Sequence, residues 1–532
     1  MENSYNEKER KSPGELFKDF REIQVSEFFR KNKAYLGYSG KIRSLTTIIH
    51  ELVTNALDAC EESEILPEIE VKIEKIDDEY KISCKDNALG IPEEYIGKVF
   101  GEMLAGTKFY KNAQTRGQQG IGVAGVTMFS LMTTGKPIRV VTSSKILNDN
   151  ESECIDTKLT INISKNKPEI LESKKFIGKF RGTLVELEVK DVEYSEGAQS
   201  PLEYLRLTAI ANPHATIIFI NPNGKKIVYE RTSNIPVKKP KEIKPHPAGI
   251  TADDLYNMSR TTNFRTVSSF LINSLSRFTQ EKINELRMKL VESNIYIDLA
   301  KNPNDLTWEE CEKIVSIFKN IKFMAPPSDG LRAIGEERIL ESIKNIANPE
   351  VCYAVTRKPS VYSGGIPFQV ECAIGYGGNC GKRLKSGKEE NLKVEIMRFA
   401  NNVPLLFDAG GCVITKAIYD IDWNKYEIKN FENSNTLIFV NVLSTYIPYT
   451  SAGKQSISDE YEIYNEIRLA LMEVARKIQN YLLEKEKEEI ERTRMKILSV
   501  YAIPCSEAIS ILTDQNQEEI YNKFIKIIEK KY

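Results

Sequence analysis

The sequence predicts an α+β fold with much antiparallel sheet. Apolar residues recur at helical spacing over residues 44–61, which indicates a helix. Residues 69–73 and 80–84 alternate apolar with polar side chains, as two paired strands do, and residues 183–189 and 216–220 indicate further strands. This pattern is not that of a doubly wound nucleotide-binding fold, in which helices and strands alternate regularly.

Length and composition restrict the class of protein. The chain has 532 residues, so about two to four domains are expected. Its 41% hydrophobic and 28% charged residues are typical of a soluble globular protein. No segment approaches the roughly 18 consecutive apolar residues of a membrane span, and the polar N-terminus lacks the apolar core of a secretory signal. These patterns predict a location inside the cell.

Charge and reactive side chains argue against several functions. A net charge of −1 provides no general attraction to nucleic acid. The nine cysteines include no paired C-x-x-C, so no zinc or disulfide framework is expected, and Cys60, Cys84 and Cys412 are interpreted as buried apolar residues. Only three histidines occur, which argues against histidine-dependent catalysis or a histidine-rich metal site.

Breaks along the chain predict its domain organisation. Residues 1–20 are expected to form a loosely ordered arm, and residues 21–240 the first domain. A segment rich in proline and lysine, 236–247, marks the end of that domain. Residues 241–325 are then expected to be mostly helical, with Thr251 placed to cap the first helix.

The remaining chain returns to mixed helix and strand. Residues 326–500 are expected to form a third domain, with a strand at 437–442. Apolar residues from Tyr464 to Leu482 recur at helical spacing and define one face of a long helix. That helix runs into a charged stretch, after which residues 501–532 form a short C-terminal segment.

Glu51 and Asn55 are the first candidate site residues. They lie four positions apart on the first predicted helix and so share one face. A carboxylate can orient and deprotonate an attacking water, and an amide oxygen one turn away can ligate a Mg²⁺ ion that bridges phosphates. Alone, the pair is more typical of a solvated polar face, but two glycine-containing segments downstream favour the functional interpretation.

Asp86 and Gly90 belong to the first of these segments, a turn that directly follows a predicted strand. The carboxylate can accept a hydrogen bond from the amino group of adenine, and the glycine lets backbone and ligand approach closely. By itself, the segment is more typical of a simple turn begun by aspartate.

The second segment, residues 117–125, is a glycine loop that leads into a predicted helix of about 123–133. Exposed amides and the positive end of the helix dipole can hold a triphosphate. Thr107 and Lys108, just upstream, can add a hydroxyl and a positive charge, with a solvated surface pair as the alternative. No βαβ unit precedes the loop, so it does not match a dinucleotide fingerprint.

Thr183 and Lys454 are isolated candidates. The hydroxyl of Thr183 can support adenine, or the residue can be an ordinary strand threonine. Lys454 lies in a loop of small residues that lacks the spacing of a Walker P-loop. Its distance along the chain suits a cation that arrives from another domain to sense the γ-phosphate, and a surface lysine is the alternative.

Together these segments resemble the GHKL ATPases, which include gyrase-type topoisomerases, heat-shock chaperones and sensor kinases. Within that superfamily the sequence is most similar to the B subunits of type IIB DNA topoisomerases (topoisomerase VI), over nearly the whole chain. The resemblance rests on Thr115-Arg-Gly-Gln-Gln-Gly-Ile-Gly122, Ala211-Asn-Pro-His-Ala215, Lys244-Pro-His-Pro247, Phe323-Met-Ala-Pro-Pro327, Pro359-Ser-Val-Tyr-Ser-Gly-Gly365, Arg398-Phe-Ala-Asn-Asn-Val-Pro-Leu405 and Ile447-Pro-Tyr-Thr-Ser-Ala-Gly-Lys454-Gln455.

The resemblance implies a GHKL (Bergerat) ATPase sandwich, a helix–two-turn–helix insert, and an α/β transducer domain with a long C-terminal stalk helix. It implies ATP and Mg²⁺ as cofactors, with Glu51 as the general base, Asn55 as the metal ligand and Lys454 as the transducer lysine. The full set of expected nucleotide-binding residues is Asn55, Asp86, Gly90, Thr107, Lys108, Gly117, Gln118, Gln119, Gly120, Ile121, Gly122, Val123, Ala124, Thr183, Lys454 and Gln455.

The resemblance also implies a reaction cycle. ATP closes two B subunits into a gate around one DNA duplex, and a tyrosine-bearing A subunit cleaves double-stranded DNA, so that supercoils are relaxed and DNA is decatenated. The C-terminal segment is expected to dock the A subunit in an A₂B₂ assembly, and the N-terminal arm to cross to the opposite B subunit. A nucleoid-associated protein of a prokaryotic or archaeal cytoplasm is implied.

One departure from the family pattern is Ala88, where the first glycine box usually has glycine. If this position needs a positive φ, alanine costs about 1 kcal/mol. Two alternative functions stay open. One is a chaperone-like GHKL clamp for protein clients, and the other is a scaffold for a tyrosine nuclease that hydrolyses little ATP.

Overall fold

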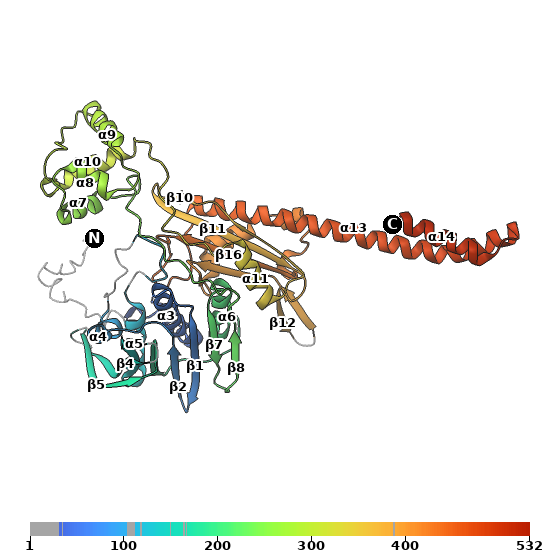
Figure 1. The fold of residues 1–532 in the computed structure, drawn as a ribbon, viewed down its shortest axis with the longest axis horizontal. Coiled ribbons are helices and arrows are strands. Elements are labelled where there is room, and N and C mark those ends of the chain that lie inside the picture. The colour runs from blue at the N-terminus through green and yellow to red at the C-terminus, as the bar shows by residue number, and fades with distance from the viewer. Residues whose placement is uncertain are drawn as a thin grey trace, which may run out of the picture.

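The computed structural model describes residues 31–34, 36–103, 112–117, 120–148, 151–162, 165, 167–386 and 389–531. The predicted arm at 1–20 lies outside these residues. The described chain forms three bodies (Figure 1): a first domain with one large sheet, a helical insert, and a second sheet domain from which a long helix projects.

A mixed sheet forms the base of the first domain. Among the described residues, eight strands run in the order β5-β4-β3-β6-β2-β1-β7-β8. Neighbouring strands are antiparallel except β1 and β7, which are parallel. The four predicted strands are confirmed as β1, β2, β6 and β7. The strand bounds are β1 Glu68–Ile76, β2 Glu79–Lys85, β3 Ile138–Ile146, β4 Ser152–Asn162, β5 Lys167–Gly178, β6 Thr183–Val189, β7 Thr216–Ile220 and β8 Lys226–Tyr229.

Helices cover one face of this sheet (Figure 1). They are α3 Lys41–Glu62, α4 Glu93–Gly101, α5 Gly122–Thr134 and α6 Pro201–Ala211. The predicted helices at 44–61 and 123–133 are confirmed within α3 and α5. Leu45, Ile48 and Val53 of α3 are fully buried in the core between helices and sheet. Each such side chain contributes roughly 1.5–3 kcal/mol by its removal from water.

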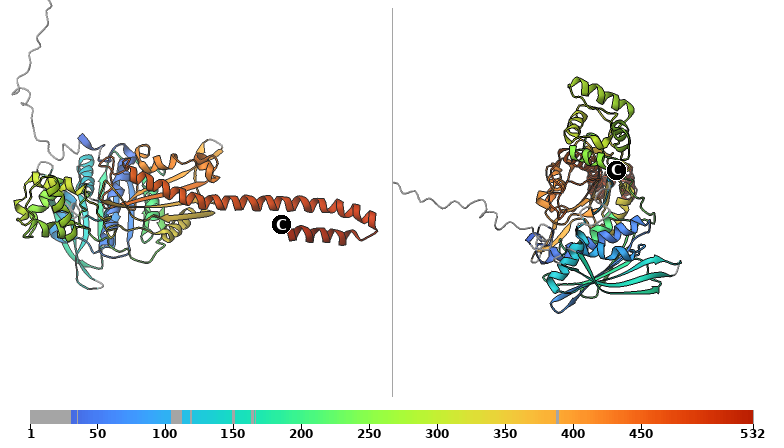
Figure 2. Two further views of the ribbon diagram at one scale, coloured as in Figure 1. Left: turned by 90° about the horizontal axis from the view of Figure 1, so that it is seen from above. Right: turned by 90° about the vertical axis from the view of Figure 1, so that its left-hand side faces the viewer.

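The helical insert has an apolar core of its own. It consists of α7 Ala252–Thr261, α8 Val267–Ser274, α9 Gln280–Glu292, a 3₁₀ turn Pro303–Asp305, and α10 Trp308–Phe318. Thr251 caps α7 as predicted, because its hydroxyl accepts the N–H of Asp254 at 3.1 Å while the Asp254 carboxylate accepts the N–H of Thr251. The insert lies at the end of the molecule from which the long helix points away (Figure 2).

A second sheet, in the order β10-β11-β16-β14-β15 with β9 beside β11, forms the next domain. The predicted strand at 437–442 is confirmed within β16, and all residues of β16 are buried. The bounds are α11 Glu336–Ala347, β9 Val351–Thr356, β10 Ser360–Tyr362, β11 Ile366–Tyr376, β12 Lys382–Ser386, β13 Glu389–Lys393, β14 Glu395–Ala400, β15 Val403–Pro404, α12 Val413–Tyr419 and β16 Thr436–Ser444, with 3₁₀ turns Ala409–Gly411, Trp423–Tyr426 and Phe431–Asn433.

An apolar core joins the two sheet domains. Leu207 and Ile210 of α6 are buried together with Ile339 and Ile343 of α11 and with side chains of the second sheet.

The three cysteines interpreted as buried apolar residues, Cys60, Cys84 and Cys412, are indeed buried.

The long helix α13 runs from Tyr461 to Thr513. Ile467, Leu471 and Ile478 are fully buried against the second sheet, so the predicted apolar face is confirmed. The helix continues through the charged stretch, because Glu, Lys and Arg are good helix formers. It also continues through Pro504, beyond the domain boundary expected at 500. Helix α14, Gln517–Lys531, then turns back beside it (Figure 1).

Among the described residues, α13 is the one helix that is long and apolar enough to cross a membrane. An 18-residue window in it has a mean hydropathy of 1.4, and only 11% of that window is buried. This finding differs from the sequence expectation, which rested on unbroken apolar runs and not on average hydropathy. One such helix is weak support for a membrane segment.

Candidate functional site

A cavity of about 420 Å³ opens where the first domain meets the second sheet domain. Its size is typical of a site for a small ligand. Helix α3, the turn after β2, the start of α5 and a loop of the second sheet domain all contribute to its walls. The predicted site residues that line it are Glu51, Asn55, Asp86, Gly90, Gly117, Gly120, Ile121, Gly122, Val123, Ala124, Thr183 and Lys454.

Glu51 lies against the first turn of α5. Its side chain is 23% exposed, and a Cβ atom on Gly122 would lie 2.1 Å from Glu51 Oε2. Because that distance is far shorter than van der Waals contact, any larger residue at position 122 would force the carboxylate to move from this position. A proton acceptor therefore lies at a helix N-terminus, where backbone amides attract anions.

Asn55 is oriented by its own helix. Its Nδ2 donates to the backbone carbonyl of Glu51 at 2.7 Å, which leaves Oδ1 to face another partner. Within the described part of the chain, no group of three His, Cys, Asp or Glu could hold a metal ion. Asn55 Oδ1 is an oxygen ligand of the kind that Mg²⁺ prefers, and Mg²⁺ beside phosphates usually takes only one or two protein ligands. The residues present fit that ion.

Asp86 is held by two backbone amides. Its Oδ1 accepts the N–H of Ala88 at 2.9 Å and that of Thr183 at 3.1 Å. Burial raises the pKa of Asp86 to about 6, and the two hydrogen bonds oppose that effect only in part. The carboxylate is a fixed acceptor, suited to an amino group such as that of adenine.

The turn after β2 has the shape that Gly90 permits. Gly90 has a φ of 90°, and a Cβ there would lie 2.0 Å from a backbone oxygen of β3. Ala88 is buried and lies outside the positive-φ region, so the cost considered for alanine at this position does not arise. Thr183 supports the turn from β6, where its hydroxyl pairs with that of Thr142 at 3.0 Å.

The N-terminus of α5 faces the cavity. Ile121 is its N-cap and has no side chain that could satisfy the first amides, and no acidic residue lies in the first turn. Residues 120–124 all line the cavity. Uncapped amides at the positive end of a helix dipole are suited to phosphate oxygens.

Lys454 enters the cavity from the second sheet domain. Its loop is a tight turn, in which Lys454 has a φ of 51° and donates its N–H to Ser451 O at 3.1 Å. Ala452 and Lys454 both line the cavity. Lys454 thus comes from one domain and most of the cavity wall from the other. The position of its ammonium group in the cavity therefore depends on the relative position of the two domains.

The chain is similar to known proteins along nearly its whole length. Residues 40–168 match the family described as histidine kinase-, DNA gyrase B-, and HSP90-like ATPase, and residues 326–494 match that described as topoisomerase VI B subunit, transducer. The type 2 DNA topoisomerase 6 B subunit of Pyrococcus horikoshii is 47% identical over 97% of this chain and 96% of its own length.

The chain belongs to the family of type 2 DNA topoisomerase 6 B subunits. Relatives from Pyrococcus furiosus, 45% identical over 97% of this chain and 96% of their own, and from Methanothermobacter thermautotrophicus, 46% identical over 96% of each, carry the same description. The ATPase region of Saccharomyces cerevisiae topoisomerase II has a TM-score of 0.43 and 11% identity over 88% of this chain and 98% of its own. By the two family matches, the first domain is a GHKL ATPase fold and the second sheet domain is a transducer.

One predicted residue of this topoisomerase subunit does not line the cavity, and four others cannot be placed because they lie outside the described residues. Gln455 is not among the described residues that line the cavity, since its buried Oε1 accepts the N–H groups of Leu406 and Phe407, each at 3.2 Å. Gln455 therefore braces the Lys454 loop against the transducer. The other four lie outside the described residues: Thr107, Lys108, Gln118 and Gln119.

Two cavity neighbours were not predicted from the sequence. Tyr38 lines the cavity and stacks on Phe129, with ring centroids 4.9 Å apart. His50 Nε2 lies 3.8 Å from Glu51 Oε1. Burial lowers the pKa of His50 although the Glu51 carboxylate opposes that shift, so the imidazole is neutral at neutral pH. No spacing or composition signal distinguishes either residue from ordinary core positions.

Proposed function

We propose that this chain is the ATP-binding and hydrolysing subunit of a type IIB topoisomerase, with Mg²⁺ as metal cofactor. The observation that carries the proposal is that Glu51 and Lys454, from different domains, line one cavity. Asp86 would accept the adenine amino group, the amides of residues 120–124 would hold the phosphates, and Asn55 Oδ1 would ligate Mg²⁺.

The chemistry assigns a proton acceptor to the attacking water and a cation to the phosphate that is transferred. Glu51 takes the proton of the attacking water, and its place beside Gly122 puts that water next to the phosphate-binding amides. Lys454 stabilises the negative charge on the γ-phosphate. Loss of that phosphate removes the partner of Lys454, which couples hydrolysis to the position of the transducer.

The five segments then take distinct roles. Residues 1–20 form the arm that crosses to the opposite subunit, 21–240 the ATPase domain, 241–325 the helix–two-turn–helix insert, 326–500 the transducer with its stalk, and 501–532 the docking segment for the A subunit. Exposed apolar side chains support the last assignment, because Leu512 is 82% exposed near the end of α13.

In this scheme ATP closes two B subunits on one duplex by an isologous contact. The tyrosine-bearing A subunit cuts DNA in an A₂B₂ assembly, and the passage of one duplex through another relaxes supercoils and separates linked circles. Such an assembly acts on DNA in the cytoplasm, at the nucleoid. The description of the relatives as B subunits supports an A-subunit partner.

A comparison of ATPase stimulation tests the proposal. The purified chain, mixed with the A subunit from the same genome, is supplied with duplex DNA or with an unfolded protein client. We expect hydrolysis to rise with DNA and not with the client. Stimulation by the client alone would favour a chaperone-like clamp, and hydrolysis near background in every mixture would favour a scaffold.

A further inference from the structure

The segment that leads into the glycine loop is bonded across the domain junction. Residues 112–117, which we call the stem, end at Gly117 in the nucleotide cavity. Four hydrogen bonds tie the stem to residues that follow the ATPase domain in sequence. They are Ile243 N–H to Asn112 O at 3.0 Å, Gln114 N–H to Gly330 O at 2.9 Å, Arg332 N–H to Gln114 Oε1 at 2.6 Å, and Asn401 Nδ2 to Thr115 O at 2.9 Å.

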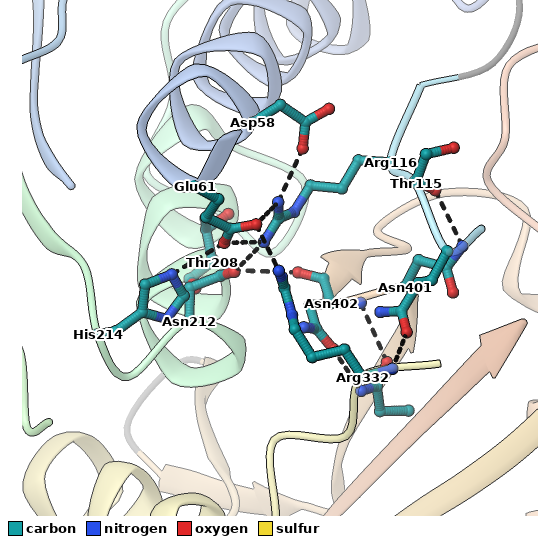
Figure 3. Close-up of polar contacts among 12 residues, drawn as sticks. Asp58, Glu61, Thr115, Arg116, Thr208, Asn212, His214, Arg332, Asn401 and Asn402 are labelled. Carbon is teal, nitrogen blue, oxygen red and sulfur yellow. Dashed lines mark hydrogen bonds and ion pairs between the residues drawn. The ribbon is translucent and has the colours of Figure 1, made fainter. Parts of the chain in front are cut away.

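Arg116, also in the stem, bonds in the opposite direction, toward the ATPase domain. Its buried guanidinium contacts Glu61 in the last turn of α3 at 2.6 and 2.7 Å, and Asp58 at 2.8 Å. Figure 3 shows that Arg332 reaches the same Glu61 carboxylate from the transducer side, at 2.7 Å. Two guanidinium groups, one from the stem and one from the transducer, therefore share one buried carboxylate.

His214 completes the surroundings of that carboxylate. Its Nε2 lies 2.8 Å from Glu61 Oε1. Burial alone would raise the pKa of Glu61, but Arg116, Arg332 and His214 together hold it well below its usual range. Glu61 is therefore ionised at neutral pH and can pair with both arginines there.

A hydrogen-bonded chain continues from Arg116 into the transducer sheet. Arg116 Nη2 donates to Asn212 Oδ1 at 2.7 Å, and Asn212 Nδ2 donates to Asn402 O at 3.1 Å. Asn441 Nδ2 then donates both to Asn402 Oδ1 at 2.8 Å and to Glu371 Oε2 at 3.0 Å. Glu371 lies on β11, the strand against which α13 packs.

Stability alone does not account for this cluster. The two domains already share the apolar core between α6 and α11. A buried ion cluster is weak support for stability, because the desolvation of its charges offsets most of their attraction. What such a cluster does fix is geometry, since each group accepts few arrangements of its partners.

We propose that the stem couples the nucleotide cavity to the transducer sheet, with Arg116 and Arg332 as positioning residues that act through Glu61. This link is independent of the direct reach of Lys454 into the cavity. The proposal rests on the proposed function, in so far as the cavity binds ATP. A nucleotide that fixes Gly117 restrains the stem, and the stem restrains residues 330–335 and 401–402.

Hydrogen exchange tests the link in the full-length chain. The Lys454→Ala background removes the direct route, and Mg²⁺ with a non-hydrolysable ATP analogue is the probe. We expect the analogue to slow amide exchange in residues 330–335 by about fivefold or more, the lower end of typical coupling between sites. Arg332→Gln in the same background is expected to abolish this protection while analogue affinity stays within about twofold of the background, since Arg332 does not line the cavity.

Two further variants separate coupling from folding. Gln114→Ala removes only the acceptor of the Arg332 N–H and leaves the Glu61 cluster intact. It should therefore reduce the protection of residues 330–335 by the analogue. This variant keeps the test possible if Arg332→Gln does not fold. Arg332→Lys keeps a positive charge near Glu61 and should restore part of the protection that Arg332→Gln loses. Arg206→Gln is the matched control, because Arg206 forms an ion pair across the junction to Glu395 without touching the stem.

The outcomes distinguish this inference from the proposed function. Absence of analogue binding to the wild-type chain would overturn both. Binding without slower exchange in residues 330–335 would overturn the coupling alone. Equal protection in the Arg332→Gln, Gln114→Ala and Arg206→Gln variants would also overturn it, because the stem contacts would then be ordinary packing.

Discussion

The carboxylate of Glu51 occupies the space that a side chain on Gly122 would fill, since a Cβ there would lie 2.1 Å from Oε2. The glycine that begins α5 thus has two roles. It exposes its amide to the cavity, and it lets a proton acceptor lie against the same turn. The relationship explains why a glutamate on α3 and a glycine some seventy positions later form one site.

Gly122→Ala is expected to displace Glu51 and lower ATP turnover by about a hundredfold, since a shift of about 1 Å in a catalytic group has an effect of that order. Steady-state kcat and KM, measured with the A subunit and DNA, give the result. The matched control is Gly197→Ala, where an added Cβ meets nothing within 4 Å. Equal kcat values in the two variants would show that the Glu51–Gly122 contact is not needed.

Glu51→Gln is expected to bind ATP and to lose turnover by roughly 10²–10⁴-fold, the usual contribution of a general base. The amide keeps the size of the side chain but cannot accept a proton from water. Equilibrium binding of ATP and single-turnover hydrolysis separate the two effects. Wild-type turnover in this variant would remove Glu51 from the role of base.

Asp86 is predicted to make ATP binding depend on pH. Its pKa of about 6 means that the carboxylate is protonated below that pH in the free protein. Adenine donates to the ionised form, so binding must then expel a proton, and affinity should fall by up to about tenfold per pH unit below 6. The dissociation constant of ATP between about pH 5 and about pH 8 measures the effect.

Asp86→Asn is the control for that measurement, because ATP phosphates titrate in the same range. The variant should bind ATP roughly 10- to 100-fold more weakly at neutral pH, since an amide nitrogen would oppose the donors of Ala88, Thr183 or adenine. Its remaining pH dependence should be that of the phosphates alone. An identical pH profile in wild type and variant would contradict the role of Asp86.

Lys454→Ala is expected to lower the rate of hydrolysis by about 10²–10³-fold, the effect of removing one group that stabilises transition-state charge. ATP should still bind, because all the other described residues that line the cavity, except Ala452, belong to the ATPase domain. The matched control is Lys477→Ala on the exposed side of α13. A loss of affinity with an unchanged maximal rate would instead make Lys454 a simple binding residue.

Much of the fold followed from local patterns in the sequence. The helix α3, the strand pair β1–β2 and the cap at Thr251 each depend on residues close together in the chain, so spacing alone was enough to predict them. The parallel pairing of β1 with β7 was not predicted, because it joins segments more than a hundred residues apart. The full length of α13 was also missed, since a charged stretch suits both an exposed helix and a linker.

The residues of the candidate site also include some that could be predicted from the sequence and some that could not. Glu51, Asp86 and the glycine loop could be selected because each lies in a short pattern with a chemical meaning. The ion cluster of Glu61, Arg116 and Arg332 could not, because no spacing links three residues from distant segments. Ala88 is a case in which the sequence raised a question that only the structure answers. Whether alanine costs free energy there depends on its backbone φ, which the structure shows is not positive.

Relaxation of a supercoiled plasmid by the assembled A and B subunits tests the central claim most directly. The account predicts continuous relaxation by the wild type with ATP and Mg²⁺. It predicts no more than a single strand passage per assembly with Glu51→Gln, which closes the gate but cannot reset it. Relaxation that needs no ATP, or that continues at the wild-type rate in Glu51→Gln, would contradict the account.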